Sequence, residues 1–211
     1  MKNLIFIGAG DWSLEIWSWL KDAKGYGTEF TFKGFLDKNP NALVKFDFCK
    51  YEVLGNVDEY IIQRNDVFVC AIAKPDVKEI VTKIIIEKGG EFLNIIHKNA
   101  ILFNNITFGK GIVISPNCVI SNNCVLGDNV ALNLSCTLGH DVHIGNYCQI
   151  NSQCDLTGYV TLGEKVFLGS RVSLIPKVKV VDNVVIGAGS VVFRNIKNSG
   201  TYVGNPAKKL M

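Results

Sequence analysis

A six-residue hydrophobic repeat fills the C-terminal half of the chain and constrains its fold more than any other feature. An aliphatic or aromatic residue recurs at every sixth position from Ile96 to Val192 without interruption. A small apolar residue, usually Val or Cys, follows four positions later, and Gly often comes directly after the aliphatic residue. Neither the helix period of 3.6 nor the strand period of 2 produces this pattern. The repeat predicts a parallel β-helix in which three hexads, eighteen residues, complete one triangular coil.

The cysteines fit this repeat. The chain has seven cysteines and no CxxC motif, so a disulfide framework is not expected. Five of them fall on the second inward position of a hexad, where a free cysteine acts as a small buried apolar residue rather than a metal or redox group. The five are Cys118, Cys124, Cys136, Cys148 and Cys154.

We also expect Gly after the aliphatic residue to suit the turn conformation.

Residues 1–94 have a different pattern, in which buried strands alternate with helical segments. This alternation predicts a small parallel sheet with βαβ crossovers, followed by the β-helix over residues 95–211. The turn "GAGDWS" ends the first strand, and Gly8 and Gly10 fit the first two glycines of a dinucleotide fingerprint. Ser13 replaces the third glycine, and Asp37 ends the second strand. We interpret this half as binding one nucleotide; the alternative is a glycine that only turns the chain.

Further candidates for substrate binding surround this turn. Asp11 can cap the first helix, and Trp12 lies in the turn itself, so it is the tryptophan expected near a ligand. Trp17 lies on the apolar face of the predicted helix and is expected in the core or in an interface. The third strand ends in a turn at Lys74, which is the last candidate for substrate binding.

The stretch "TLGHDVHIGNY" contains two of the three histidines. Both should point outward, and the eighteen-residue step places Asn122 and Gly158 next to His140. The same arithmetic places Val125, Thr161 and Lys179 in the column of His143, with no polar convergence. A metal site needs three or four converging ligands, which this stretch does not supply, so no metal is expected. His140 is either an exposed turn residue or a general base that Asp141 could orient.

Charge and hydropathy exclude several classes of protein. The net charge is +3 with no block of Lys or Arg, which argues against a nucleic-acid surface. No apolar run approaches the length of a membrane helix, and the N-terminus has no signal-peptide pattern. We therefore expect a cytoplasmic protein with no membrane insertion.

Four motifs together, "GAGDW", "GFLD", "LGHDVHIG" and "YVGNPAKKL", carry a resemblance over essentially the whole chain. The chain resembles bacterial nucleotide-sugar acetyltransferases, namely the bacillosamine and perosamine N-acetyltransferases and the sialic acid O-acetyltransferase group. The resemblance implies a Rossmann-like N-terminal domain and a left-handed β-helix. It also implies acetyl-CoA as co-substrate, a nucleotide-linked amino sugar as acceptor, and a homotrimer with active sites at subunit interfaces.

The resemblance also implies roles for individual residues. His140 matches the catalytic base, Asp141 the residue that orients it, and Gly158 the glycine whose N–H holds the thioester oxygen. Residues matching the coenzyme A site are Gly158, Ser170, Gly187, Ala188, Pro206 and Lys208. Those assigned to the nucleotide-sugar site are Gly8, Gly10, Asp11, Trp12, Asp37 and Lys74.

The functional hypothesis is direct acetyl transfer from acetyl-CoA to a nucleotide-linked amino sugar of the 4-amino-4,6-dideoxy type, in bacterial surface-glycan (lipopolysaccharide or O-antigen) biosynthesis. O-acetylation of sialic acid or a related sugar is the main alternative, because one base serves an amine or a hydroxyl. A non-catalytic or metal-binding β-helix and a nicotinamide-linked reductase are the remaining alternatives.

Overall fold

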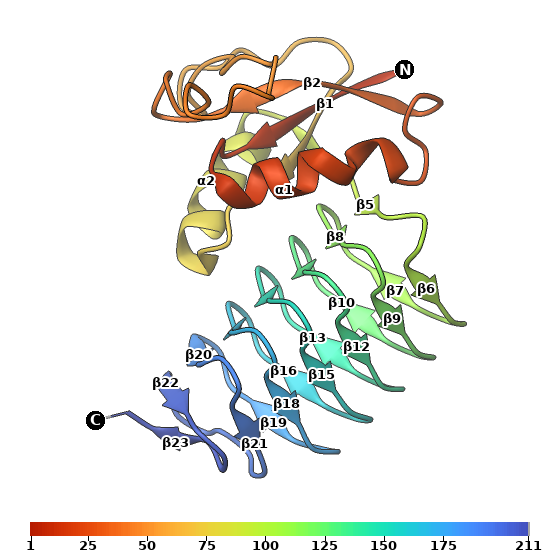
Figure 1. Cartoon of the computed structure of the whole chain (residues 1–211), viewed down its shortest axis with the longest axis vertical. Coiled ribbons are helices and arrows are strands. Elements are labelled where there is room, and N and C mark those ends of the chain that lie inside the picture. Colours follow the sequence, from red (N-terminus) through yellow and green to blue (C-terminus); the bar gives the residue numbers. More distant parts are fainter. Residues whose placement is uncertain (211) are drawn as a thin grey trace. The chain divides into compact units, whose positions relative to one another are not determined.

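A computed structural model describes residues 1–210 and divides them into two compact units. The first unit comprises Met1–His97 and the second begins at Lys98 (Figure 1).

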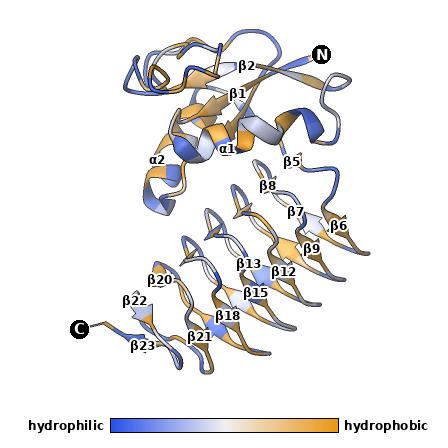
Figure 2. Ribbon diagram, in the orientation of Figure 1, coloured by the Kyte–Doolittle hydropathy of each residue, from blue (hydrophilic) through white to orange (hydrophobic). Residues whose placement is uncertain are grey.

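The first unit is built on a four-stranded parallel sheet with the order β2-β1-β3-β4. The central strand β1 is apolar along most of its length, as its orange colour in Figure 2 shows, and its residues from Leu4 to Ile7 are buried. Helix α1 connects β1 to β2 and helix α2 connects β3 to β4, as the alternating pattern predicts, whereas residues 37–65 connect β2 to β3 without a helix. The elements are β1 (Lys2–Ile7), α1 (Asp11–Trp19), the 3₁₀ helix η1 (Leu20–Asp22), β2 (Phe30–Leu36), β3 (Asp66–Cys70), α2 (Pro75–Glu87), β4 (Glu91–Phe92) and β5 (Ile95–Ile96).

The expected cap of α1 is wrong. Gly10, not Asp11, is the N-cap residue, and no side chain caps the helix. Asp11 is already helical, and Ser13 Oγ donates instead to the carbonyl oxygen of Gly10 at 2.6 Å. Trp17 is half-buried and packs edge-on against Tyr51 beside a surface cavity, so it lies outside the core, and its expected place in an interface stays a prediction.

The second unit is the predicted β-helix, with one short strand per hexad and parallel pairing between residues eighteen positions apart. Val125 pairs with His143, which in turn pairs with Thr161. The first face contains β6 (Ile101–Leu102), β9 (Val119–Ile120), β12 (Thr137–Leu138), β15 (Asp155–Leu156), β18 (Ser173–Leu174) and β21 (Val191–Val192).

The other two faces repeat this arrangement. The second contains β7 (Thr107–Phe108), β10 (Val125–Leu126), β13 (His143–Ile144), β16 (Thr161–Leu162) and β19 (Lys179–Val180). The third contains β8 (Val113–Ile114), β11 (Ala131–Leu132), β14 (Gln149–Ile150), β17 (Phe167–Leu168), β20 (Val184–Ile186) and β22 (Gly200–Val203), with β23 (Lys208–Lys209) antiparallel to β22.

The interior of the β-helix follows the repeat. The five cysteines on the second inward position are at most 1% exposed, so they fill the core as expected. The glycines do not supply the turn conformation that was expected of them. The residue with left-handed backbone geometry lies two positions after each glycine, as at Asp141 (φ 58°). The glycines are needed for space: a Cβ atom on Gly127 would lie 2.9 Å from the backbone nitrogen of Asn146 in the next coil.

Candidate active site

The corner between β12 and β13 carries His140 and Asp141. Asp141 adopts the left-handed conformation, which Asn and Asp tolerate better than most residues. This conformation turns its carboxylate toward the preceding side chain, and His140 Nδ1 lies 2.8 Å from Asp141 Oδ2. A carboxylate can only accept a hydrogen bond, so Nδ1 carries the proton and the neutral ring keeps its lone pair on Nε2. His140 can therefore accept a proton at Nε2.

Gly158 lies one coil further along this corner, as the eighteen-residue step predicts. A Cβ atom on Gly158 would lie 2.8 Å from Nε2 of His140 and 2.9 Å from its Cε1 atom. Only glycine leaves the ring in this place. The two coils are also joined by the backbone, because Tyr159 N–H donates to the carbonyl oxygen of His140 at 3.0 Å.

The backbone N–H of Gly158 makes no hydrogen bond to any of residues 1–210. At another corner of the β-helix the corresponding groups are capped by the next coil. There, Asp128 N–H donates to Asn146 Oδ1, and Glu164 N–H to Asp182 Oδ1, both at 2.8 Å. The unpaired N–H of Gly158 therefore belongs to the residue that the Nε2 side of the His140 ring contacts, and a donor and a base so close together suit one reacting group.

Two further side chains contact this site and were not predicted from the sequence. The ring of Tyr159 meets the ring of His140 edge-on, with centroids 4.9 Å apart. Asn123, and not the expected neighbour Asn122, contacts the acidic partner, since Asn123 Nδ2 lies 3.4 Å from Asp141 Oδ1. The side chain of Asn122 turns to the other side and caps the N–H of Asn104. Counting eighteen residues back from Asp141 instead of His140 would have identified Asn123.

His143 does not join this site. It is exposed on β13 between Val125 and Thr161, neither of which is charged. Within residues 1–210, no group of three or more His, Cys, Asp or Glu side chains is placed to hold a metal ion.

Three of the residues expected to contact coenzyme A, Ser170, Gly187 and Ala188, lie on a second corner. Ser170 and Ala188 lie in successive coils, and Gly189 N–H donates to the carbonyl oxygen of Ser170 at 2.9 Å. Gly187 is tied to the last coil, since its N–H donates to the carbonyl oxygen of Tyr202 at 2.8 Å. The structure therefore places Ser170 and Ala188 next to each other in adjacent coils.

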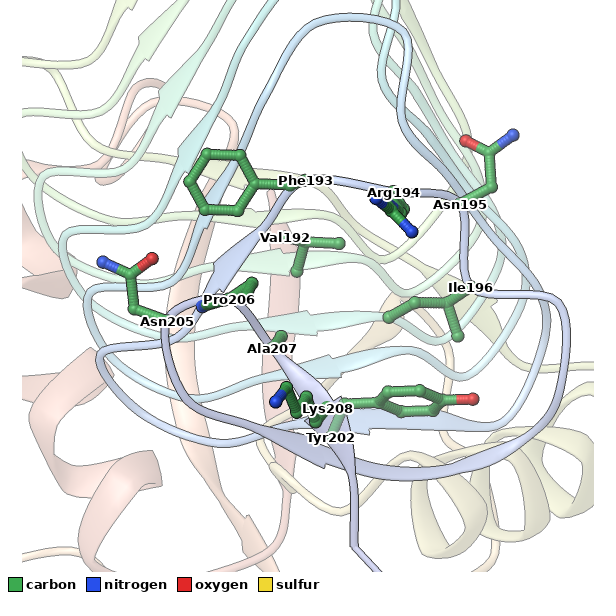
Figure 3. A pocket seen from close by; sticks show the side chains of 10 residues that line it. All are labelled: Val192, Phe193, Arg194, Asn195, Ile196, Tyr202, Asn205, Pro206, Ala207 and Lys208. Atoms are coloured by element: carbon green, nitrogen blue, oxygen red, sulfur yellow. The ribbon is translucent and has the colours of Figure 1, made fainter.

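Pro206 and Lys208 line a cavity of about 580 Å³ at the C-terminal end of the β-helix (Figure 3). Phe193 and Tyr202 add aromatic surface, and Arg194 adds a second cation that the sequence interpretation missed. A cavity with aromatic walls and two cationic side chains suits a flat ring system that carries phosphate groups.

In the first unit, Gly8 and Asp37 meet at the carboxyl ends of β1 and β2. Asp37 accepts hydrogen bonds from Ala9 N–H and Asn39 N–H, each at 2.9 Å, so its carboxylate fixes the glycine turn. Gly8 has φ 99°, and a Cβ atom there would lie 2.8 Å from Cγ1 of Ile72. Gly8 and Asp37 line a cavity of about 220 Å³, which is the expected place for a nucleotide in an open α/β sheet.

The other residues of the predicted nucleotide-sugar site lie outside the lining of this cavity. Asp11 is exposed and pairs with Lys45, Nζ to Oδ1 at 2.9 Å. Gly10 and Lys74 serve as the N-cap residues of α1 and α2. Trp12 is half-buried, and the Lys78 ammonium lies 5.8 Å from the centroid of its ring.

No helix within residues 1–210 is both long enough and apolar enough to cross a bilayer.

Comparison with known proteins finds no matching family model and no matching curated protein. Solved structures do match over the whole chain. PerB from Caulobacter crescentus, in complex with CoA and GDP-perosamine, is 23% identical with a TM-score of 0.88 over 100% of this chain and 98% of its own. The acetyltransferase domain of PglB from Neisseria gonorrhoeae FA1090, in complex with acetyl coenzyme A, is 24% identical with a TM-score of 0.85 over 99% of each chain.

WeeI from Acinetobacter baumannii AYE is more distant, at 18% identity and a TM-score of 0.67 over 100% of both chains. The expected fold, a small Rossmann-like unit followed by a left-handed β-helix, is thereby confirmed, and the chain shares it with these proteins along its full length.

Proposed function

We propose that this protein is an acyltransferase that moves the acetyl group of acetyl-CoA to the amine of a nucleotide-linked amino sugar. The observation that carries the proposal is that His140 Nε2 lies beside Gly158, whose backbone N–H has no partner within residues 1–210. Acyl transfer from a thioester requires a base for the attacking group and a donor for the oxygen that becomes negative.

The proposed reaction passes through a single tetrahedral intermediate. The neutral amine attacks the thioester carbonyl carbon, and His140 Nε2 accepts the proton that the nitrogen loses. Gly158 N–H donates to the oxyanion, which then collapses and expels coenzyme A as the thiolate. Asp141 keeps Nδ1 of the ring protonated and so keeps Nε2 available. The cysteine at this corner, Cys124, is buried with its Sγ atom 3.2 Å from the carbonyl oxygen of Gly139, which favours direct transfer.

The binding surfaces support the same assignment. The adjacent coils at Ser170 and Ala188 offer backbone groups that coenzyme A could contact. The cavity beside Lys208 and Arg194 suits the phosphorylated adenine end of coenzyme A. The cavity of Gly8 and Asp37 suits part of a nucleotide. PerB, which shares the fold, was crystallised with CoA and GDP-perosamine, and this supports a nucleotide-linked 4-amino-4,6-dideoxy sugar as acceptor. We further propose a role in surface-glycan biosynthesis and a cytoplasmic homotrimer with acceptor and base on neighbouring chains.

The test is acetyl transfer by the purified protein. Acetyl-CoA is supplied with GDP-, UDP- or dTDP-linked 4-amino-4,6-dideoxy sugars or with free sialic acid, and the release of coenzyme A is followed with a thiol reagent. We expect turnover with one of the amino sugars and a loss of about 10²–10⁴-fold in kcat for His140→Gln. His143→Gln is the matched control, since it removes an exposed imidazole from the same hexad, and it should keep wild-type turnover. Full activity in His140→Gln would overturn the assignment of the base.

A further inference from the structure

Asp141 is itself held in place by a hydrogen-bonded column of amides. Asn123 Nδ2 lies 3.4 Å from Asp141 Oδ1, and Asn105 Nδ2 donates to Asn123 Oδ1 at 2.8 Å. The three residues occupy the same place in successive coils, with φ values of 58°, 61° and 58°. The column therefore runs over three coils and ends at His140.

The direction of the Asn123 amide follows from its partners. The carboxylate of Asp141 has no proton to donate, so it must receive the NH₂ group of Asn123. The oxygen of Asn123 then faces Asn105, whose NH₂ group it accepts. With Oδ2 bound to His140 and Oδ1 to Asn123, the carboxylate cannot rotate without losing a hydrogen bond.

The ring of His140 is held from the other direction as well. The edge-on contact with Tyr159 comes from the next coil, whereas Asn123 acts from the preceding one. The imidazole is half-exposed, so burial alone does not fix its orientation. Its position over Gly158 depends on these neighbours.

We propose that Asn123 is a positioning residue for proton transfer, because its amide fixes the carboxylate that fixes the His140 ring and its tautomer. This proposal rests on the proposed function of His140 as the base. A competing explanation is that asparagine is present only because it tolerates the left-handed conformation. Asn117 provides the matched control, since it has φ 62°, is exposed, and lies at a different corner of the β-helix.

Three variants separate the two explanations. Asn123→Gly keeps the left-handed conformation and removes the amide, whereas Asn123→Asp keeps the size and places a second carboxylate beside Asp141. Asn117→Gly changes the same residue type elsewhere. We expect kcat to fall about tenfold in Asn123→Gly, with the KM for acetyl-CoA unchanged. In Asn123→Asp the acidic limb of the pH–rate profile should move to higher pH, because the added negative charge favours the protonated ring. Wild-type kcat in both Asn123 variants, or an equal loss in Asn117→Gly, would overturn the proposal.

A second measurement does not depend on activity. The chain has only three histidines, so ¹⁵N NMR can report the tautomer of each ring, with His140 assigned from the spectrum of His140→Gln. In alkaline buffer we expect the proton on Nδ1 of His140 in the wild type and in Asn117→Gly, and a mixture of tautomers in Asn123→Gly. An unchanged tautomer in Asn123→Gly would contradict the positioning role. If the wild type transferred no acetyl group, the proposed function would fail, while this spectrum would still decide whether Asn123 orients the ring.

Discussion

The imidazole of His140 lies over the Cα atom of Gly158 in the next coil, so close that a Cβ atom on Gly158 would stand 2.8 Å from Nε2. Real Cβ atoms do not come this near to a ring nitrogen, so a side chain at position 158 forces the imidazole to move. Because Gly158 does not have a positive φ, its backbone would accept another residue without strain. The requirement for glycine here therefore comes from the histidine and not from the turn.

Gly158→Ala should consequently reduce kcat by about a hundredfold, since a displacement of about 1 Å at the reacting group is enough for such a loss. The free energy of unfolding should change by less than about 1 kcal/mol, because the new methyl group lies at an exposed corner. Steady-state kinetics and urea denaturation measure the two quantities. The control is the double variant with His140→Ala, in which the clash is gone and the methyl group should cost little further activity. Strictly additive losses would contradict a contact between these two residues.

The repeat predicts the β-helix well because the fold is nearly one-dimensional. Each hexad contacts its counterpart eighteen residues away, so the position of Gly158 relative to His140 follows from counting. The small parallel sheet follows from the alternation of strands and helices for a similar reason, because each of its elements has a local pattern.

The sequence is less informative where a side chain can choose between partners. Counting places Asn122 beside His140, yet Asn122 turns away and caps Asn104, while Asn123 supports Asp141. Asp11 has a good position for capping α1, yet it pairs with Lys45, thirty-four residues further on, in a loop with no periodic pattern. Such contacts depend on rotamers and on loop paths, which no period specifies.

An ion pair in the first unit, between the half-buried Lys33 and the buried carboxylate of Asp66, predicts how stability depends on pH. Burial alone would raise the pKa of Asp66, but hydrogen bonds from Lys33, from the N–H of Gln63 and from Tyr60 outweigh it and hold this pKa below its usual value. A carboxyl with a lowered pKa in the folded state stabilises the protein above its unfolded pKa, about 4, and loses this contribution as the pH falls through the folded value.

Asp66→Asn should therefore lower the free energy of unfolding by about 1–3 kcal/mol at neutral pH, because it removes the charge of an acceptor on which several donors converge. The difference between variant and wild type should shrink in acid, where the wild type also loses its charge. Urea denaturation at neutral pH and near pH ~3 measures both values. A difference that stays constant or grows in acid would contradict the ion pair as its source.

The cysteines give a prediction about reactivity. Cys49 is half-buried and the other six are buried; burial raises the pKa of the Cys70 thiol to about 11, which leaves almost no thiolate at neutral pH. A thiol reagent should therefore modify one cysteine quickly in the native protein and seven after unfolding. Cys49→Ser should abolish the fast phase and retain full acetyl transfer, as direct transfer requires. Loss of turnover in Cys49→Ser at unchanged stability would argue for a covalent acyl-enzyme instead.

Two neighbouring lysines, Lys208 and Lys209, test the proposed site for coenzyme A. Lys208 lines the C-terminal cavity together with Arg194, whereas Lys209, the next residue of β23, is not part of the lining (Figure 3). Successive residues of a strand point to opposite faces. The two lysines therefore carry the same charge at adjacent positions but on opposite faces of the strand. Lys208→Ala should raise the KM for acetyl-CoA about tenfold with little change in kcat, because an ammonium that binds phosphate acts before the chemical step. The effect should weaken with added salt, and Lys209→Ala should leave the KM within about twofold of wild type. Equal effects of the two substitutions would indicate general electrostatic attraction and would remove the cavity as the site of the phosphorylated end of coenzyme A.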